Sequence, residues 1–232
     1  MLDEALEALK TYDWGTDPKV LLPIDEAVVK TYGNADARKD LEAKLAAILT
    51  TGVTRDAKDF VCRKLMLIGT AQSTPTLAGL LTDKDLSHMA RYALERIPAS
   101  EAAQALRDAL PKVTGPTQVG VIGSLGVRRD TASVPALAAL LNNADAAVAR
   151  AAAIALGDIG TAEAAKALAD GKPTTPEARQ AATDASLACA EDLLASGKKV
   201  EALAVYKSLV GESQPKQVRL AATRGMLACA GK

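Results

Sequence analysis

Residues 145–168 read DAAVARAAAIALGDIGTAEAAKAL, and this stretch decides the fold. The apolar residues of its first half recur at three- and four-residue steps, so they share one helical face: Val148, Ala152, Ala155, Leu156 and Ile159. Gly160 is expected to end this helix in the left-handed conformation, and Thr161 to cap a second helix with an inner face of Ala164, Ala165 and Leu168. Two helices this short cannot bury their apolar faces alone. The pair must therefore stack on similar pairs.

Three upstream segments, residues 62–81, 90–110 and 119–141, repeat this pattern. The Leu/Ile pair of the first helix recurs after 29, 28 and 34 residues, and the last interval is longer because the turn at 127–131 holds extra residues. Pro75 and Pro135 each stand at the start of an expected second helix, a position that favours proline. Helix pairs at this period predict an all-α solenoid.

The residues that repeat most faithfully are Ala149–Gly160 and Pro135–Leu141. They resemble a HEAT repeat of the short, bacterial type. The resemblance extends over roughly Val53 to Gly171 and implies a right-handed α-α superhelix of stacked antiparallel helix pairs. It implies little about function, because such repeats serve scaffolds, adaptors, a few lyases and a few DNA-repair enzymes.

The remaining residues extend the array at both ends. We expect one α-solenoid over residues 1–232, with capping helices at 1–52, HEAT-like repeats at 53–172 and longer helix pairs at 173–232. In the last part, Gly197, Ala202 and Tyr206 follow the small-and-aromatic spacing of half a tetratricopeptide repeat. Near the N-terminus, Tyr12 and Trp14 are expected to seal the end of the apolar core; the alternative is a ligand-stacking pair.

The sequence predicts no catalytic, cofactor-binding or metal-ligating residue. His88 is the only histidine. Some HEAT-repeat hydroxylases bind two irons through repeated His-Glu pairs, which one histidine cannot supply. The three cysteines stand apart on apolar helical stretches, where a free thiol behaves as a small hydrophobe: Cys62, Cys189 and Cys229. The segment GVIGSLG at 120–126 lacks the strand of a dinucleotide fingerprint, so Gly120 and Gly123 are expected to permit tight helix packing instead.

The charges are balanced, with 28 basic and 28 acidic residues, and this disfavours nucleic acid as a partner. Asp145 with Arg150, and Asp83 or Asp85 with His88 or Arg91, are expected to form a ladder of structural contacts between repeats. In the long turn, Arg128 and Arg129 are candidate partner-binding residues, and a solvated turn is the alternative.

The last expected helix runs from near Pro215 to Gly231, with no following helix to cover Leu220, Met226 and Leu227. An uncovered apolar face marks an interface or a missing neighbour. The two hypotheses are that this end binds a protein partner or another copy, and that the chain is a fragment of a longer solenoid. The three residues are therefore candidate partner-binding residues.

The predicted function is a non-catalytic protein-interaction scaffold that presents the inner, second-helix surface near residues 75–81, 101–110, 135–141 and 161–168. The alternatives are a nucleic-acid-binding or repair protein like the HEAT-repeat DNA glycosylases, and a chromophore-lyase-like chaperone. No stretch is long and apolar enough to span a membrane. The N-terminal residues show no signal-peptide pattern, and the sequence leaves two locations open: the cytoplasm, or the envelope or periplasm if a leader has been removed.

Overall fold

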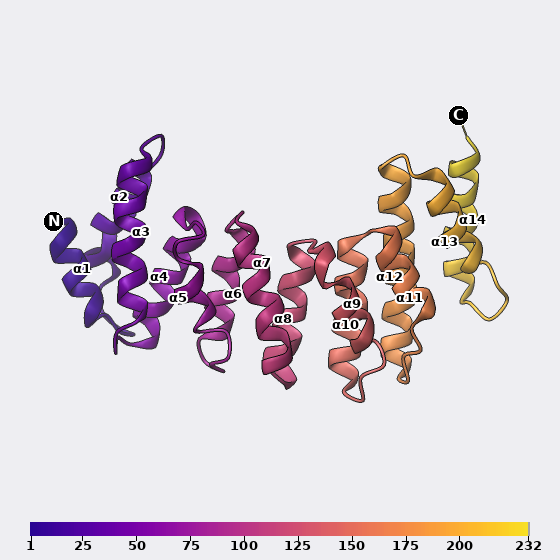
Figure 1. Cartoon of the computed structure of the whole chain (residues 1–232), viewed down its shortest axis with the longest axis horizontal. Helices are drawn as coiled ribbons and strands as arrows, with labels where there is room; N and C mark the ends of the chain where they lie inside the picture. Colours follow the sequence, from indigo (N-terminus) through magenta and orange to yellow (C-terminus); the bar gives the residue numbers. More distant parts are fainter. Residues whose placement is uncertain (232) are drawn as a thin grey trace. The chain divides into compact units, whose positions relative to one another are not determined.

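The computed structural model describes residues 1–231, and over them the chain is built from α-helices and short 3-10 turns without a strand. It divides into two compact units, unit 1 from Met1 to Val113 and unit 2 from Thr114 onward. In Figure 1, unit 1 runs from indigo to magenta and unit 2 continues to yellow. The division falls inside the stretch predicted as continuous HEAT-like repeats, residues 53–172.

Unit 1 contains α1 (Leu2–Lys10), η1 (Pro18–Leu21), α2 (Leu22–Lys30), α3 (Ala35–Leu49), α4 (Arg55–Ile68), α5 (Thr74–Ala78), α6 (Ser87–Arg96), α7 (Ser100–Ala109) and η2 (Leu110–Lys112). In it, α4 packs on α6, while α5 packs on both α3 and α7. Unit 2 contains α8 (Gly115–Val127), η3 (Thr131–Ser133), α9 (Val134–Leu140), α10 (Ala146–Ile159), α11 (Ala162–Asp170), α12 (Pro176–Ala195), α13 (Lys199–Ser208) and α14 (Lys216–Ala230). In it, α10 lies between α8 and α12, and the shorter helices α9 and α11 pack on each other. Stacked helix pairs of this kind confirm the all-α solenoid architecture.

The stretch that decides the fold has the predicted structure. Every residue predicted for the inner face of α10 is buried, as are Ala164, Ala165 and Leu168 of α11. Gly160 ends α10 with φ +66°, and the Thr161 hydroxyl accepts the backbone N–H of Ala164 at 3.1 Å. Pro75 and Pro135 lie in the first turns of α5 and α9.

Gly123 does not permit the tight helix packing predicted for it, and close helix contacts of unit 2 are made at Gly126 and Gly157. Gly123 is exposed, and a Cβ built on it meets nothing within 4 Å. The contact between α8 and α10 is made at Gly126, where a Cβ would lie 2.9 Å from the Cα of Ala155. The contact between α10 and α12 is made at Gly157, where a Cβ would lie 2.9 Å from the Cβ of Ala185. The prediction was wrong because Gly123 lies on the outer face of α8.

Two aspartates of the predicted ladder of charge pairs, Asp145 and Asp83, form hydrogen bonds at the starts of helices. Asp145 accepts the backbone N–H of Ala147 at 2.8 Å and so caps α10 instead of pairing with Arg150. Asp83 likewise accepts the N–H groups of Asp85 and Leu86 ahead of α6. The side chain of His88 is exposed and lies edge-on to Tyr92, with ring centroids 5.3 Å apart.

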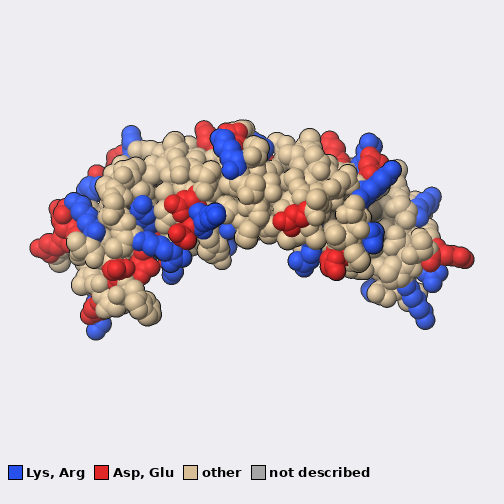
Figure 2. Space-filling view, turned by 90° about the horizontal axis from the view of Figure 1, so that it is seen from below, with Lys and Arg blue, Asp and Glu red and all other residues tan. Residues whose placement is uncertain are grey.

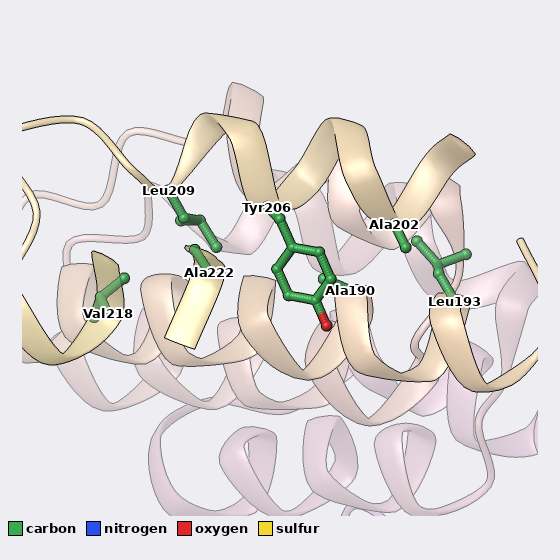
Figure 3. Close-up of a cluster of buried hydrophobic side chains, with 7 residues drawn as sticks. All are labelled: Ala190, Leu193, Ala202, Tyr206, Leu209, Val218 and Ala222. Atoms are coloured by element: carbon green, nitrogen blue, oxygen red, sulfur yellow. The ribbon is translucent and has the colours of Figure 1, made fainter. Parts of the chain in front are cut away.

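The C-terminal helices α12, α13 and α14 enclose their own apolar cluster, which Figure 3 shows. Tyr206 lies at its centre, only 2% exposed, and its ring fills the space over Gly225, where even a methyl group would clash. Ala202 and Tyr206 therefore act as the small and the aromatic residue that the spacing predicted. Burial raises the pKa of the Tyr206 hydroxyl.

The prediction that Trp14 seals the apolar core was wrong. Its indole is 92% exposed, while Tyr12 is half-buried against Phe60 with ring centroids 6.5 Å apart. The N-terminal core is closed by aliphatic residues instead, including Leu9, Leu21 and Ile24.

Candidate functional site

The short second helices of unit 2 form the walls of a groove between α11 and α13, with part of α12 as its floor. We call it the α11–α13 groove. It encloses about 750 Å³. Its floor is made of buried apolar and small residues: Leu168, Ala182, Ser186, Leu193 and Leu209. Because α11 and α13 carry Ala or Ser at many facing positions, their side chains leave the space between the helices open.

The rim of the α11–α13 groove is mainly basic. Lys166, Lys172 and Arg179 line it and are exposed, opposite the single carboxylate of Glu201. Lys166 pairs with Asp170 at 3.2 Å, and Arg179 donates to the carbonyl oxygen of Thr174 at 2.6 Å. Lys172 therefore carries the least compensated positive charge on this rim.

A second groove adjoins the first along α11. It encloses about 420 Å³ between α9 and α11 and shares Lys166 and Gly171 with the α11–α13 groove. Val134, Pro135 and Ala138 form its α9 wall. The two grooves together run over the residues predicted as the inner, second-helix surface at 135–141 and 161–168.

Unit 1 has a smaller groove of the same kind between α5 and α7, enclosing about 340 Å³. Its walls include Pro75, Ala78 and Ala105, and charged or amide side chains lie along its α7 side. The second-helix surface is thus grooved in each unit.

The two arginines predicted as partner-binding residues belong to a folded turn. Arg129 has a left-handed backbone with φ +52°, and its guanidinium forms an ion pair with Asp192 of α12. Asp158 lies near this pair. Partial desolvation raises the pKa of Asp158, Asp192 adds to that rise, and Arg129 opposes it. Arg128 is half-buried and has contacts of its own. This turn is therefore neither loose nor simply solvated.

The three candidate residues of α14 do not share one environment. Leu220 and Leu227 are 61% and 70% exposed and lie two helical turns apart on the outward face. Met226 is half-buried and packs against the Tyr206 cluster. The apolar outward face of α14 is therefore smaller than the sequence predicted.

Sequence reasoning missed a buried carboxylate in unit 1. Glu42 of α3 is 1% exposed and accepts the backbone N–H groups of Thr70 and Ser73 at 2.7 and 3.1 Å, together with the Thr70 hydroxyl. One turn earlier, Arg38 donates to the carbonyl oxygen of Ile68 at 2.7 Å. The i, i+4 spacing of Arg38 and Glu42 was the available signal. Both side chains fix the α4–α5 turn.

The residues of this chain that match a known protein family lie in unit 2. A family model described as HEAT repeats matches residues 114–186, which run from α8 into the middle of α12. This stretch consists of HEAT repeats. The α9–α11 groove and the α11 side of the larger groove are therefore surfaces of HEAT repeats, whereas α13 and α14 lie beyond the matched residues.

No curated protein matches the chain in sequence. Among solved structures, human deoxyhypusine hydroxylase in complex with glycerol aligns over 100% of this chain and 96% of its own, at 15% identity and a TM-score of 0.41. A match at this level transfers neither activity nor ligands to the HEAT repeats of this chain.

Three further properties concern the surface charges, the metal-ligating side chains and the helices. On the face drawn in Figure 2, basic and acidic side chains are intermixed along the chain. Within residues 1–231, no three His, Cys, Asp or Glu side chains are grouped so as to hold a metal ion. No helix of the described part has both the length and the apolar character needed to cross a bilayer.

Proposed function

We propose that unit 2 is a non-catalytic protein-binding module, and that the α11–α13 groove receives an amphipathic helix of a protein partner. The observation that carries this proposal is an open groove with a buried apolar floor and a basic rim. An amphipathic helix laid in such a groove buries its apolar residues at i, i+3, i+4 and i+7 against the floor.

The rim defines the charge of the partner. Lys166, Lys172 and Arg179 face Glu201, so the rim favours a helix whose flanks carry Asp or Glu. The α9–α11 groove extends the same surface and would accommodate residues beyond the end of that helix. A nucleic acid needs a more extensive basic surface than the three basic side chains of this rim provide, and the face drawn in Figure 2 carries intermixed acidic and basic side chains.

The test compares two alanine-to-glutamate variants as bait in native extract treated with nuclease. Ala204→Glu places a bulky negative group on the α13 wall of the groove. Ala139→Glu makes the same change at an exposed position of α9 that does not line either groove. Glutamate is a good helix former, so both variants should fold.

A stoichiometric protein that binds the wild-type chain and Ala139→Glu but not Ala204→Glu would support the proposal. Equal capture by both variants would show that the partner does not occupy the α11–α13 groove. If every partner disappeared on nuclease treatment, the nucleic-acid alternative would replace the proposal.

A further inference from the structure

A second pocket lies in unit 1, where the turn between α1 and η1 meets the first turns of α4. It encloses about 620 Å³. The whole chain has only six aromatic residues of the Phe, Trp and Tyr types, and three of them line this pocket: Tyr12, Trp14 and Phe60. The core of unit 1 is closed by other residues, so Trp14 is not needed for packing. Three aromatic residues in one pocket of an aromatic-poor chain therefore indicate a ligand-binding site.

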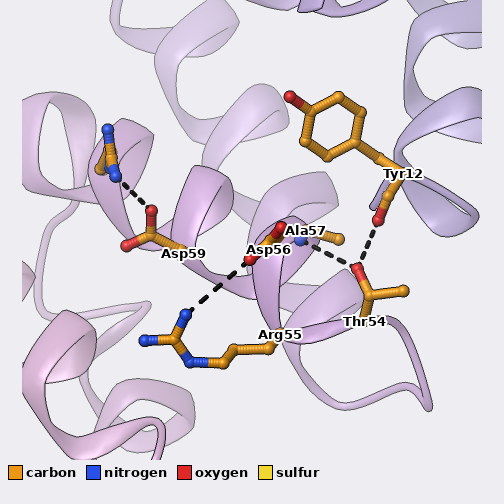
Figure 4. A network of polar contacts seen from close by, with 7 residues as sticks. Tyr12, Thr54, Arg55, Asp56, Ala57 and Asp59 are labelled. Atoms are coloured by element: carbon orange, nitrogen blue, oxygen red, sulfur yellow. Dashed lines mark hydrogen bonds and ion pairs between the residues drawn. The ribbon is translucent and has the colours of Figure 1, made fainter. Parts of the chain in front are cut away.

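The exposed indole of Trp14 belongs to an ordered turn. The N–H of Thr16 donates to the carbonyl oxygen of Asp13 at 3.0 Å, and Gly15 takes φ +90°. The hydroxyl of Thr54 donates to the carbonyl oxygen of Tyr12, which ties the turn to the N-terminus of α4 (Figure 4). A large aromatic surface kept in water on such a turn is available to a ligand without rearrangement.

The aromatic rings form a wedge and not a flat platform. The rings of Tyr12 and Phe60 are inclined by 49°. The ammonium of Lys64 lies 4.4 Å from the centroid of Phe60, so a cation already interacts with that ring. Because Lys64 already lies over the Phe60 ring, that ring is not free to bind the cation of a quaternary ammonium ligand, and the inclined rings give a flat sugar ring no level surface.

Most of the charges at the rim neutralise one another. Arg55 lies 3.8 Å from Asp56 (Figure 4), and Arg63 lies 2.5 Å from Asp59. Asp17 accepts the backbone N–H of Lys19 at 3.0 Å through one carboxylate oxygen, and its other oxygen remains for a ligand. The pocket thus offers an apolar wedge with one carboxylate beside it.

We propose that this pocket binds a proline-containing peptide segment in the polyproline II conformation, with a lysine or arginine next to the prolines. A pyrrolidine ring packs against exposed aromatic faces, as in other aromatic-lined grooves that recognise such peptides, and the exposed indole of Trp14 beside the inclined rings of Tyr12 and Phe60 provides such faces. The polyproline II backbone makes no internal hydrogen bonds, so its carbonyl oxygens can accept the indole N–H of Trp14. The basic residue of the peptide pairs with Asp17.

The experiment uses the full chain, in which Trp14 is the only tryptophan, so its fluorescence reports on this pocket alone. The probe is a peptide of about ten residues, prolines followed by one arginine, which adopts polyproline II on its own. A Gly-Ser peptide of the same length with the same arginine is the control. We expect a saturable shift of Trp14 emission to shorter wavelength with the proline peptide and none with the control.

Calorimetry with variants then locates the binding. Trp14→Ala should weaken binding of the proline peptide at least about tenfold, as expected for a central aromatic residue. Tyr32→Ala removes an aromatic side chain that is 95% exposed in the same unit outside the pocket, and it should leave the affinity unchanged. Both residues are exposed, so neither variant should unfold the unit.

Two results would overturn the proposal. One is an unchanged Trp14 emission at millimolar proline peptide. The other is a saturable shift with a chitin or cellulose oligosaccharide in place of the peptide, which would assign the pocket to carbohydrate.

Discussion

Alanine at Gly157 should destabilise unit 2, whereas alanine at Gly123 should stabilise it. Both glycines are helical, Gly157 in the last turn of α10 and Gly123 near the middle of α8. The backbone effect of replacing glycine is favourable at both sites, with a gain of about 0.8–1 kcal/mol at Gly123 and at most that at Gly157. The difference between the variants therefore isolates the contact that each new methyl group makes.

The expected change in the free energy of unfolding of Gly157→Ala follows from the distances at this site. A Cβ there lies 2.9 Å from the Cβ of Ala185, 3.0 Å from its Cα and 3.5 Å from its carbonyl oxygen. These atoms belong to the backbone of α12 or are attached directly to it, so α10 and α12 must separate by a few tenths of an ångström. Overpacking of this kind costs about 1–3 kcal/mol, which exceeds the helix-propensity gain. The net loss at Gly157 should be about 1 kcal/mol, against a gain of similar size at Gly123.

The assay is urea unfolding of the wild-type chain and both variants. With a slope of about 1–3 kcal/mol per molar urea, the midpoints of the two variants should differ by about 1 M. Hydrogen exchange should localise the loss in Gly157→Ala to amides of α10 and α12, with α3 unchanged. If Gly157→Ala were as stable as Gly123→Ala, the close approach of α10 and α12 would be refuted.

Three other predictions concern buried or titrating groups. Glu42→Leu leaves two backbone N–H donors of the α4–α5 turn unpaired and should lower the free energy of unfolding by about 1–3 kcal/mol, while Glu42→Gln should lose less; thermal unfolding of both variants checks this. Iodoacetamide at pH 8 should modify half-buried Cys229 first, because burial raises the pKa of the Cys62 and Cys189 thiols to about 12; mass spectrometry of timed samples gives the order, and equal rates would contradict it. The raised pKa of Asp158 means that the folded state binds the carboxyl proton more tightly than the unfolded state, so the stability from this group is present below pH 3.8 and is lost as the pH rises through the folded pKa. Asp158→Asn should remove that loss, so the variant should be more stable than wild type at pH 7 but not at pH 3. Urea unfolding midpoints at the two pH values measure this difference.

The fold was predictable where the sequence repeats itself. The period of the apolar residues in α10, the glycine that ends it and the threonine that caps α11 each depend on local chemistry, and each is found in the structure. The second-helix surface also lies where the repeats placed it, because the side of a helix pair that packs on its neighbours is fixed by the apolar pattern.

Contacts between helices were less predictable, because they depend on which residues meet across a distance in the chain. Gly123 and Gly126 are both glycines of α8, and only the packing on Ala155 distinguishes them. Trp14 was assigned to the core from its residue type, yet a single turn holds it in water. Glu42 reads as a surface residue until the N–H groups of the α4–α5 turn are placed beside it. The α11–α13 groove could not be predicted from the sequence for the same reason, because its volume is the space that small side chains leave between the two helices.

The ion pair between Arg129 and Asp192 changes how unit 2 should respond to salt. In a linear array of repeats, each element interacts with its nearest neighbours, and cooperativity is transmitted one interface at a time. This pair instead links the turn after α8 to α12, past the intervening α10, and so adds a second-neighbour coupling to the array. Both side chains are partly exposed, so the coupling is worth about 0–1 kcal/mol and weakens as ionic strength rises. Raising the salt concentration should therefore make the unfolding of unit 2 less concerted with little loss of its total stability.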